Sequence, residues 1–195
     1  DLISWGAIGA RTTESQIHRE MASALSGPIG FKNGTNGNTR IAIDAIRAAQ
    51  ASHMFLSPDK QGQMTIYQTS GNPYGHVIMR GGKQPNYHAE DVATACAMLS
   101  EHQLAPHLVI DFSHGNSQKK HRQQLTVGDD VCAQIIEGSG SIVGIMAESF
   151  LEEGTQQMVP GKPLVYGQSI TDACLHWDDT VILLDKLAAA VKARF

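Results

Sequence analysis

Five short apolar segments of this chain each end beside one ionisable side chain. The clearest is Val109-Ile-Asp-Phe-Ser-His-Gly-Asn116, in which β-favouring residues give way to a hydroxyl, an imidazole, a glycine and an amide. In chain order, the five segments end at Arg11, Lys32, Arg80, His114 and Glu148. The carboxyl ends of parallel strands point to one face of an α/β fold, so we expect these five side chains to converge on one site.

Two of these residues, together with an aspartate farther along the chain, predict a metal site. His114, Glu148 and Asp172 offer a donor set that suits a borderline divalent ion with an open coordination position. Their wide spacing along the chain matches no compact metal motif. Taken singly, His114 is also compatible with a hydrogen-bonded structural histidine, and Asp172 with the N-cap of a short turn.

Three cations on separate strand ends predict an anion site beside the metal set. Arg11, Lys32 and Arg80 are suited to a phosphate or carboxylate, and the neighbouring glycines would let backbone N–H groups approach it. The alternative for each cation is an ordinary ion pair with Glu14, Asp111 or Glu148. Asp111 and Ser113, which lie close to His114 in the sequence, are candidate partners that support it. Asp111 is equally compatible with a side chain that points to a different layer of the fold.

Strands and helices alternate in the pattern of a parallel α/β fold. Residues 53–57, 64–69 and 76–80 are three β-like runs without room for a helix, so we expect the run ending at Arg80 to join the main sheet and residues 57–75 to form a hairpin insertion. Residues 117–137 predict a helix, and the final helix should bury Leu184, Leu187, Ala188 and Val191. The total is five strand and helix units, whereas a closed (β/α)8 barrel needs eight.

Composition predicts one globular domain and excludes several partners. The 195 residues are 42% hydrophobic and 17% charged, with a net charge of −4 and no basic run, so we expect neither nucleic acid nor a membrane as partner. Three cysteines without CxxC spacing, and no signal peptide, predict a cytoplasmic protein. The chain opens at Asp1 without methionine, in the middle of a structural pattern, so we expect the front of a longer protein to be absent.

Six segments together resemble the microbial type I DAHP synthases, and the likeness covers essentially the whole chain. The intervening stretches SHMFLSPDK and MTIYQTSGNPYGH look most similar to the tryptophan-sensitive form. The six segments are GAIGARTTESQ (6–16), GFKNGT (30–35), IMRGGK (78–83), IDFSHGN (110–116), MAESFL (146–151) and YGQSITDAC (166–174).

The resemblance implies a (β/α)8 TIM-barrel enzyme that condenses phosphoenolpyruvate with erythrose 4-phosphate to DAHP and phosphate, the entry step to the aromatic amino acids. It implies that His114, Glu148 and Asp172 ligate one divalent ion (Mn, Fe, Co or Zn), with His114 and Asp172 also near substrate. Ala10, Arg11, Lys32 and Arg80 would bind phosphoenolpyruvate. Lys32 would also assist proton transfer, beside His114 as the other catalytic residue.

Two family segments are missing from this sequence. The family has a metal-binding cysteine in a GPCSIHD-like segment and an aldose phosphate site in a KPRT-like segment, and neither occurs here. We therefore expect residues 1–195 to be the C-terminal part of a single TIM-barrel domain, inactive in isolation. The open sheet edges would need cover from another chain or from the missing segment.

The resemblance also implies feedback inhibition by tryptophan in a pocket near the hairpin, lined by Leu25, Ser26, Phe55 and Ser57. Each of these is equally compatible with an ordinary packing role. The family is usually homo-oligomeric. Two other interpretations remain: a different phosphoenolpyruvate-dependent sugar acid synthase, and a non-catalytic assembly fragment whose edges pair with another copy.

Overall fold

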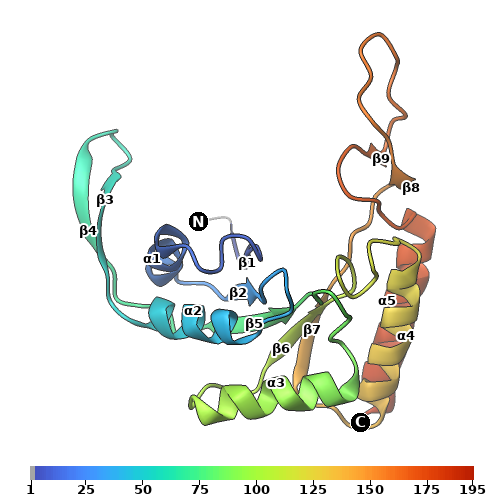
Figure 1. Ribbon diagram of the computed structural model, residues 1–195, viewed down its shortest axis with the longest axis horizontal. Coiled ribbons are helices and arrows are strands. Elements are labelled where there is room, and N and C mark those ends of the chain that lie inside the picture. The colour runs from blue at the N-terminus through green and yellow to red at the C-terminus, as the bar shows by residue number, and fades with distance from the viewer. Residues whose placement is uncertain (1–2) are drawn as a thin grey trace.

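A curved five-stranded parallel sheet forms the centre of the molecule in the computed structural model, which describes residues 3–195 (Figure 1). The strand order is β1-β2-β5-β6-β7, and every neighbouring pair is parallel. The strands are β1 (Gly6–Ile8), β2 (Ile29–Lys32), β5 (Gly75–Met79), β6 (Leu108–Asp111) and β7 (Ile142–Met146). The predicted strand ending before Arg80 is thus a central member of this sheet.

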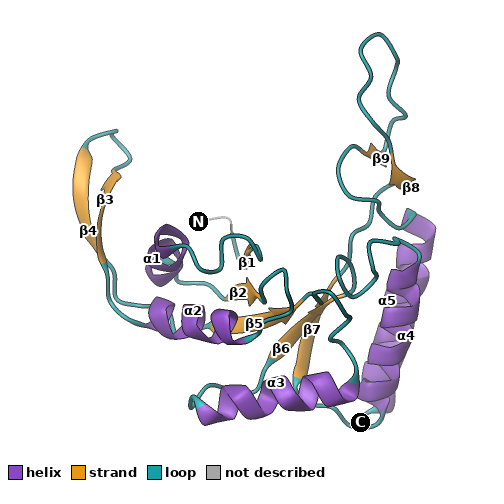
Figure 2. Ribbon diagram, viewed as in Figure 1, coloured by secondary structure: helices purple, strands orange, loops and turns teal. Residues whose placement is uncertain are grey.

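Helices follow the strands and cover one side of the sheet (Figure 2). Leu108 and Ile110 on β6, Phe112 after it, and Ile43 and Ile46 on the second helix are fully or almost fully buried in one hydrophobic core. The helices are α1 (Gln16–Ala24), α2 (Arg40–Gln50), α3 (Ala89–Glu101), α4 (Gln123–Ile136) and α5 (Trp177–Ala193). The five predicted strand and helix units are therefore all present.

Two extensions project from the body at opposite ends (Figure 1). The first is an antiparallel hairpin of β3 (Met54–Pro58) and β4 (Met64–Gln68), which begins a little before the predicted range of 57–75. The second is the arm, which we define as residues 149–176; it contains the short pair β8 (Glu152–Thr155) and β9 (Gln168–Ser169).

Two helix predictions are partly wrong. Helix α4 begins only at Gln123, because Gln118 and Lys119 both have positive φ, of 51° and 60°, which no α-helix accommodates. Helix α5 buries Leu183, Leu187 and Ala190, whereas Leu184 and Val191 are exposed. The predicted apolar stripe is displaced by one residue because this helix is apolar on more than one face.

None of the helices among residues 3–195 is both long and apolar enough to cross a membrane.

Candidate metal and anion site

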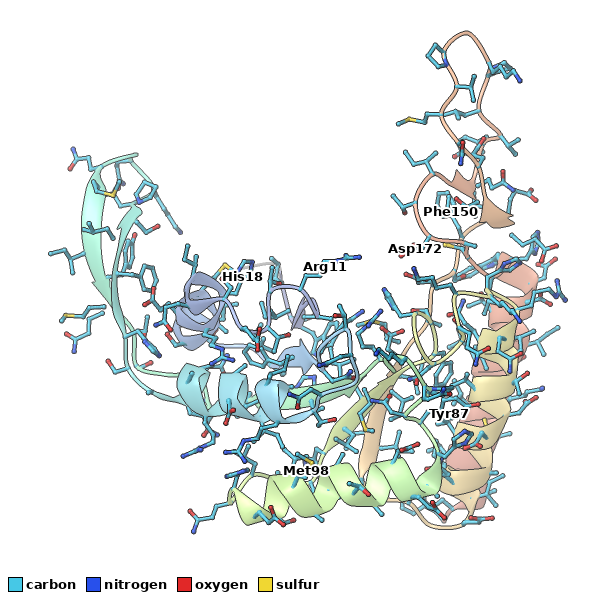
Figure 3. The ribbon with its side chains drawn as sticks, viewed as in Figure 1. Arg11, His18, Tyr87, Met98, Phe150 and Asp172 are labelled. Carbon is cyan, nitrogen blue, oxygen red and sulfur yellow. The ribbon has the colours of Figure 1, made fainter. Side chains whose placement is uncertain are left out.

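The five predicted strand-end side chains surround one cavity of about 410 Å³ at the carboxyl edge of the sheet. Figure 3 shows Arg11 and Asp172 facing this space from opposite sides, one from the loop after β1 and the other from the arm. The lining includes Ala10, Arg11, Lys32, Arg80, His114, Glu148 and Asp172. The cavity therefore contains every predicted metal-binding and substrate-binding residue.

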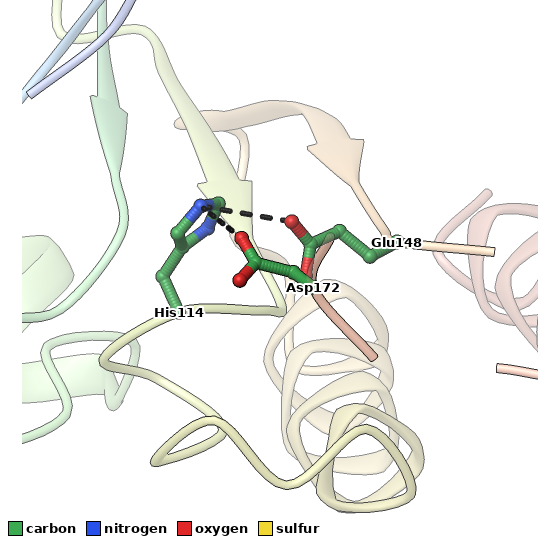
Figure 4. A group of neighbouring side chains, drawn as sticks. All are labelled: His114, Glu148 and Asp172. Atoms are coloured by element: carbon green, nitrogen blue, oxygen red, sulfur yellow. Dashed lines mark ion pairs between the residues drawn. The ribbon is translucent and has the colours of Figure 1, made fainter. Parts of the chain in front are cut away.

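His114, Glu148 and Asp172 are close enough for one ion to touch all three (Figure 4). His114 Nε2 lies 3.6 Å from Glu148 Oε1 and 4.0 Å from Asp172 Oδ2, and one ligand atom from each residue lies within 4.8 Å of the others. Donors about 2.1 Å from a tetrahedral ion are roughly 3.4 Å apart, so small side-chain rotations would close this set around a metal. The donor chemistry and spacing fit a divalent ion.

The backbone of His114 is held in a conformation that non-glycine residues rarely adopt. Its φ is 55°, in the left-handed region, and such outliers occur where surrounding structure determines them. Gly115 follows, and a Cβ there would lie only 2.7 Å from the backbone of Gly81. Glycine at 115 thus lets the His114 turn pack directly against the loop that carries Arg80.

Asp111, the last residue of β6, is buried and pairs with two members of the site. Its Oδ2 lies 2.7 Å from Lys32 Nζ and 2.9 Å from His114 Nδ1. Burial alone would raise the pKa of this carboxyl, but the His114 hydrogen bond and the Lys32 charge outweigh it and bring the pKa to about 2. Asp111 is therefore a carboxylate under all ordinary conditions.

Burial shifts the pKa of both Glu148 and Arg80 in the direction that disfavours the charged form. Burial raises the pKa of Glu148, and the Asp172 and Asp111 carboxylates raise it further, while His114 opposes the shift. Burial also lowers the pKa of Arg80, with a smaller contribution from Arg11. A bound cation near Glu148 and a bound anion near Arg80 would relieve these two costs.

Three asparagines that were not predicted from the sequence connect the loops of the site. Asn33 accepts a hydrogen bond from Arg80 N (2.8 Å) and donates to Gly81 O (3.0 Å). Asn86 accepts from Gly81 N (2.7 Å) and donates its own N–H to Asn116 Oδ1 (2.8 Å). Asn116 in turn donates to Asp111 O (2.8 Å). Their sequence signal is an asparagine soon after three of the strand ends, those beside Lys32, Arg80 and His114.

The predicted inhibitor residues lie on two neighbouring elements. Leu25 and Ser26 directly follow α1, while Phe55 and Ser57 share the half-buried face of β3. Among residues 3–195, no hydrogen bond joins these two pairs. The connection runs instead through the segment after β4: Ser23 Oγ on α1 lies 2.8 Å from Thr69 Oγ1, and Asn72 Nδ2 donates to Gly27 O, after α1, at 2.9 Å.

A parallel strand and helix array whose carboxyl edge bears a histidine, two carboxylates and three cations is typical of barrel-type α/β enzymes that handle anionic substrates. The sequence model of the DAHP synthetase I family matches residues 1–185. The chain therefore belongs to that family, which confirms the resemblance found from the motifs.

Curated relatives and a solved structure agree with this assignment. The chain is 76% identical over 195 residues to a Trp-sensitive phospho-2-dehydro-3-deoxyheptonate aldolase of Salmonella typhimurium, and 67% identical to one of Buchnera aphidicola. The structure of a phospho-2-dehydro-3-deoxyheptonate aldolase from Francisella tularensis matches all of this chain and 57% of its own, with a TM-score of 0.95 and 50% identity. The chain spans 56% of the length of these curated relatives.

Proposed function

We propose that this chain forms the greater part of the active site of a tryptophan-sensitive DAHP synthase. The reaction is the condensation of phosphoenolpyruvate with erythrose 4-phosphate and water to give DAHP and inorganic phosphate, the first step toward the aromatic amino acids. One observation carries the proposal: a single cavity in which the His114–Glu148–Asp172 set faces the cations Arg11, Lys32 and Arg80.

The cations of the cavity bind phosphoenolpyruvate in this proposal. Arg11 and Arg80 grip its phosphate and carboxylate through paired N–H donors, and the Ala10 backbone and the Lys32 ammonium complete the site. Such fixed charges hold an anionic substrate in one orientation, which lowers the entropy cost of bringing the reacting groups together. Lys32 also holds a proton at Nζ, within the cavity and available for transfer.

His114, Glu148 and Asp172 would hold one divalent ion, and Mn, Fe, Co and Zn all accept this donor set. When bound, the ion supplies Lewis-acid polarisation of the aldehyde carbonyl. His114 and Asp172 line the same cavity as the cations, and in this proposal both also contact the substrate.

The experiment that tests this function compares two proteins. One is the chain of 195 residues. The other, called the chimera below, is this chain joined to the part of the Salmonella typhimurium relative that it does not cover. We expect the chimera to release phosphate from phosphoenolpyruvate only when erythrose 4-phosphate and a divalent ion are present, and the 195-residue chain to show negligible turnover. An inactive but folded chimera would contradict the proposed function.

We expect the 195-residue chain to lack DAHP synthase activity because it lacks the GPCSIHD-like and KPRT-like segments of the family. The single-domain interpretation places the cysteine ligand and the aldose phosphate site in strands that precede this sheet in the barrel. If the 195-residue chain alone formed DAHP, the C-terminal-part interpretation would be wrong while the family assignment would stand.

Tryptophan is the proposed inhibitor, bound near Leu25, Ser26, Phe55 and Ser57. The support is the name of the relatives and the fact that none of these four residues lines the cavity of the metal set. In the chimera, Ser57→Val should keep the turnover rate but weaken tryptophan inhibition. The exposed Ser70→Val is the matched control, and equal inhibition of both variants would contradict the pocket.

We also propose a cytoplasmic homo-oligomer. The free thiols of Cys96, Cys132 and Cys174 suit a reducing compartment. One face of the hairpin exposes four large apolar side chains, which favours cover by another copy: Met54, Leu56, Met64 and Ile66. Light scattering of the chimera tests the oligomer, and a monomer at micromolar concentration would contradict it.

A further inference from the structure

Asp111 is a fully buried carboxylate to which the proposed reaction gives no role. It ends the buried strand β6 and contacts Lys32, one of the three cations, and His114, one of the three residues of the metal set. The same oxygen, Oδ2, lies 2.7 Å from Lys32 Nζ and 2.9 Å from His114 Nδ1. The other oxygen, Oδ1, accepts hydrogen bonds from the backbone N–H (2.9 Å) and the hydroxyl of Ser113.

These contacts determine which nitrogen of His114 carries the hydrogen. The Ser113 hydroxyl has one hydrogen and donates it to Asp111 Oδ1, because a carboxylate can only accept. The Ser113 oxygen also lies 2.7 Å from His114 Nδ1, where it must therefore act as the acceptor. Nδ1 faces two acceptors, Asp111 Oδ2 and Ser113 Oγ, so it is the protonated nitrogen.

The opposite nitrogen of His114 faces the two carboxylates of the metal set. Nε2 lies 3.6 Å from Glu148 Oε1 and 4.0 Å from Asp172 Oδ2. With the hydrogen on Nδ1, a neutral imidazole has its lone pair on Nε2, the form that ligates a metal. A histidine ligand whose second nitrogen donates to a carboxylate is the usual arrangement in metal sites.

Lys32 fixes Asp111 in turn. Its side chain is 12% exposed, and Asp111 is the carboxylate with which it pairs. The ammonium and the imidazole share one oxygen, so a displacement of the Lys32 side chain would move the acceptor that orients His114. The anion-binding lysine and the histidine of the metal set thus depend on one buried group.

We propose that Asp111 is a positioning residue for the metal site: it holds His114 in the tautomer with hydrogen on Nδ1, and Lys32 holds Asp111 in place. This inference rests on the proposed function, because it requires a metal at His114. Asp111 itself is buried and does not line the cavity.

The first test needs no substitution. The 195-residue chain, labelled with nitrogen-15 in its histidines and free of metal, is studied by NMR, and His114 is assigned by comparison with His114→Gln. The expected spectrum has hydrogen on Nδ1 and a lone pair on Nε2. Hydrogen on Nε2 would overturn the proposal, whether or not any Asp111 variant folds.

The second test measures Co²⁺ affinity of the chimera by calorimetry. Both oxygens of Asp111 face donors, so in Asp111→Asn the NH2 group opposes a donor in either orientation of the amide. We expect affinity to fall about 10- to 100-fold, the usual effect of losing such a partner. Asp185→Asn, the same charge change at an exposed site on α5, should leave affinity unchanged. Equal binding by Asp111→Asn and the parent would overturn the proposal.

A third variant separates positioning from simple electrostatics. Removing a cation near a metal site should tighten metal binding, and we expect this small effect, or none, for Arg11→Gln. Lys32→Met removes a cation too, but it also releases Asp111, so we expect Co²⁺ affinity to fall several-fold. Tighter binding by both variants would overturn the part assigned to Lys32.

The outcomes also distinguish this inference from the proposed function. A parent chimera that binds no Co²⁺ contradicts the function, while the NMR result still decides the tautomer. A parent that binds Co²⁺ together with an equally competent Asp111→Asn contradicts only the inference.

Discussion

Two carboxylates beside His114, those of Asp111 and Glu148, have pKa values shifted in opposite directions. Burial raises the pKa of both, but the partners of Asp111 reverse its effect there. Asp111 is buried with Lys32 and His114 against it, and these partners stabilise its charged form. Glu148 is half-buried, and its partial burial, together with the Asp172 and Asp111 carboxylates, raises its pKa and disfavours its charged form. One residue is thus a permanent anion that fixes its neighbours, whereas the other gains most from a bound cation.

Asp111 should make the unfolding free energy of the chain decrease at low pH. Its pKa is about 2 in the folded chain, below the ordinary 3.8, so its contribution is complete above about pH 4 and is lost as pH falls toward 2. A pKa lowered this far corresponds to about 2 kcal/mol of unfolding free energy. The measurement is urea unfolding of the parent and Asp111→Asn from pH 6 to pH 2, and the difference between them should narrow by about that amount. A difference that does not change with pH would contradict this assignment.

At the scale of elements, the loops after β2, β5 and β6 act as one unit. Asn33, Asn86 and Asn116 each bond to backbone or amide groups of another loop, and all three use both ends of the amide. Hydrogen-bonded amide networks of this kind favour a unique arrangement. The network joins the loop that carries Arg80 to the loop that carries His114.

Asn33→Asp should break that unit without changing side-chain volume. The amide nitrogen donates to Gly34 O and Gly81 O, and a carboxylate oxygen there would face two acceptors in a buried position. We expect unfolding free energy to fall by about 2 kcal/mol or more, as for other unsatisfied buried groups. The control is Asn36→Asp, because Asn36 is exposed and acts through its oxygen on Asn38 N, which aspartate preserves. Equal stability of the two variants would show that the network is dispensable.

The arm is a second element on which the site depends. It carries Asp172, the most exposed of the three metal-set residues, with 70% of its side chain exposed. Gln156 closes the arm on itself: its Nε2 donates to Val165 O and Gln168 O, and its Oε1 accepts from Val165 N. Asp172 is therefore placed by contacts within the arm rather than by burial.

Gln156→Ala should loosen the arm and weaken metal binding. We expect faster amide hydrogen exchange across residues 149–176, and Co²⁺ affinity of the chimera reduced several-fold, because Asp172 would then have to be ordered on binding. The exposed neighbour Gln157→Ala should change neither quantity. Faster exchange with unchanged affinity would mean that Asp172 does not depend on the arm.

These elements also explain what the sequence could predict. The strand ends are predicted correctly because one ionisable residue after each apolar run, at Arg11, Lys32, Arg80, His114 and Glu148, is a local pattern. The asparagine network depends on contacts between distant loops, and the arm on side-chain contacts such as those of Gln156 with Val165 and Gln168, neither of which local spacing reveals. The turn at Gln118 and Lys119 is mistaken for helix because its positive φ values have no glycine to mark them.

At the scale of the whole molecule, positive charge is concentrated at the cavity although the net charge is −4. Arg11 and Arg80 also line an adjoining space of about 500 Å³, together with Lys83, Lys119 and no carboxylate. Within residues 3–195, these four cations take part in no ion pair. The chain therefore presents a local positive field beside the cavity, which would attract anions.

Neutralising the two outer lysines should weaken substrate binding in a manner that depends on salt. In the chimera, we expect Lys83→Gln with Lys119→Gln to lower phosphoenolpyruvate affinity about fivefold at low ionic strength, from roughly 0.5 kcal/mol per exposed charge. The loss should shrink toward nothing near 1 M salt, where the screening length is about 3 Å. Lys60→Gln with Lys162→Gln makes the same charge change in the hairpin turn and the arm, and should have no effect at any salt concentration. The measurement is calorimetric titration with phosphoenolpyruvate. A loss of affinity that persists at 1 M salt would mean that the lysines touch the substrate directly. Equal losses of affinity in both double variants would mean that net charge, rather than the local field, attracts the substrate.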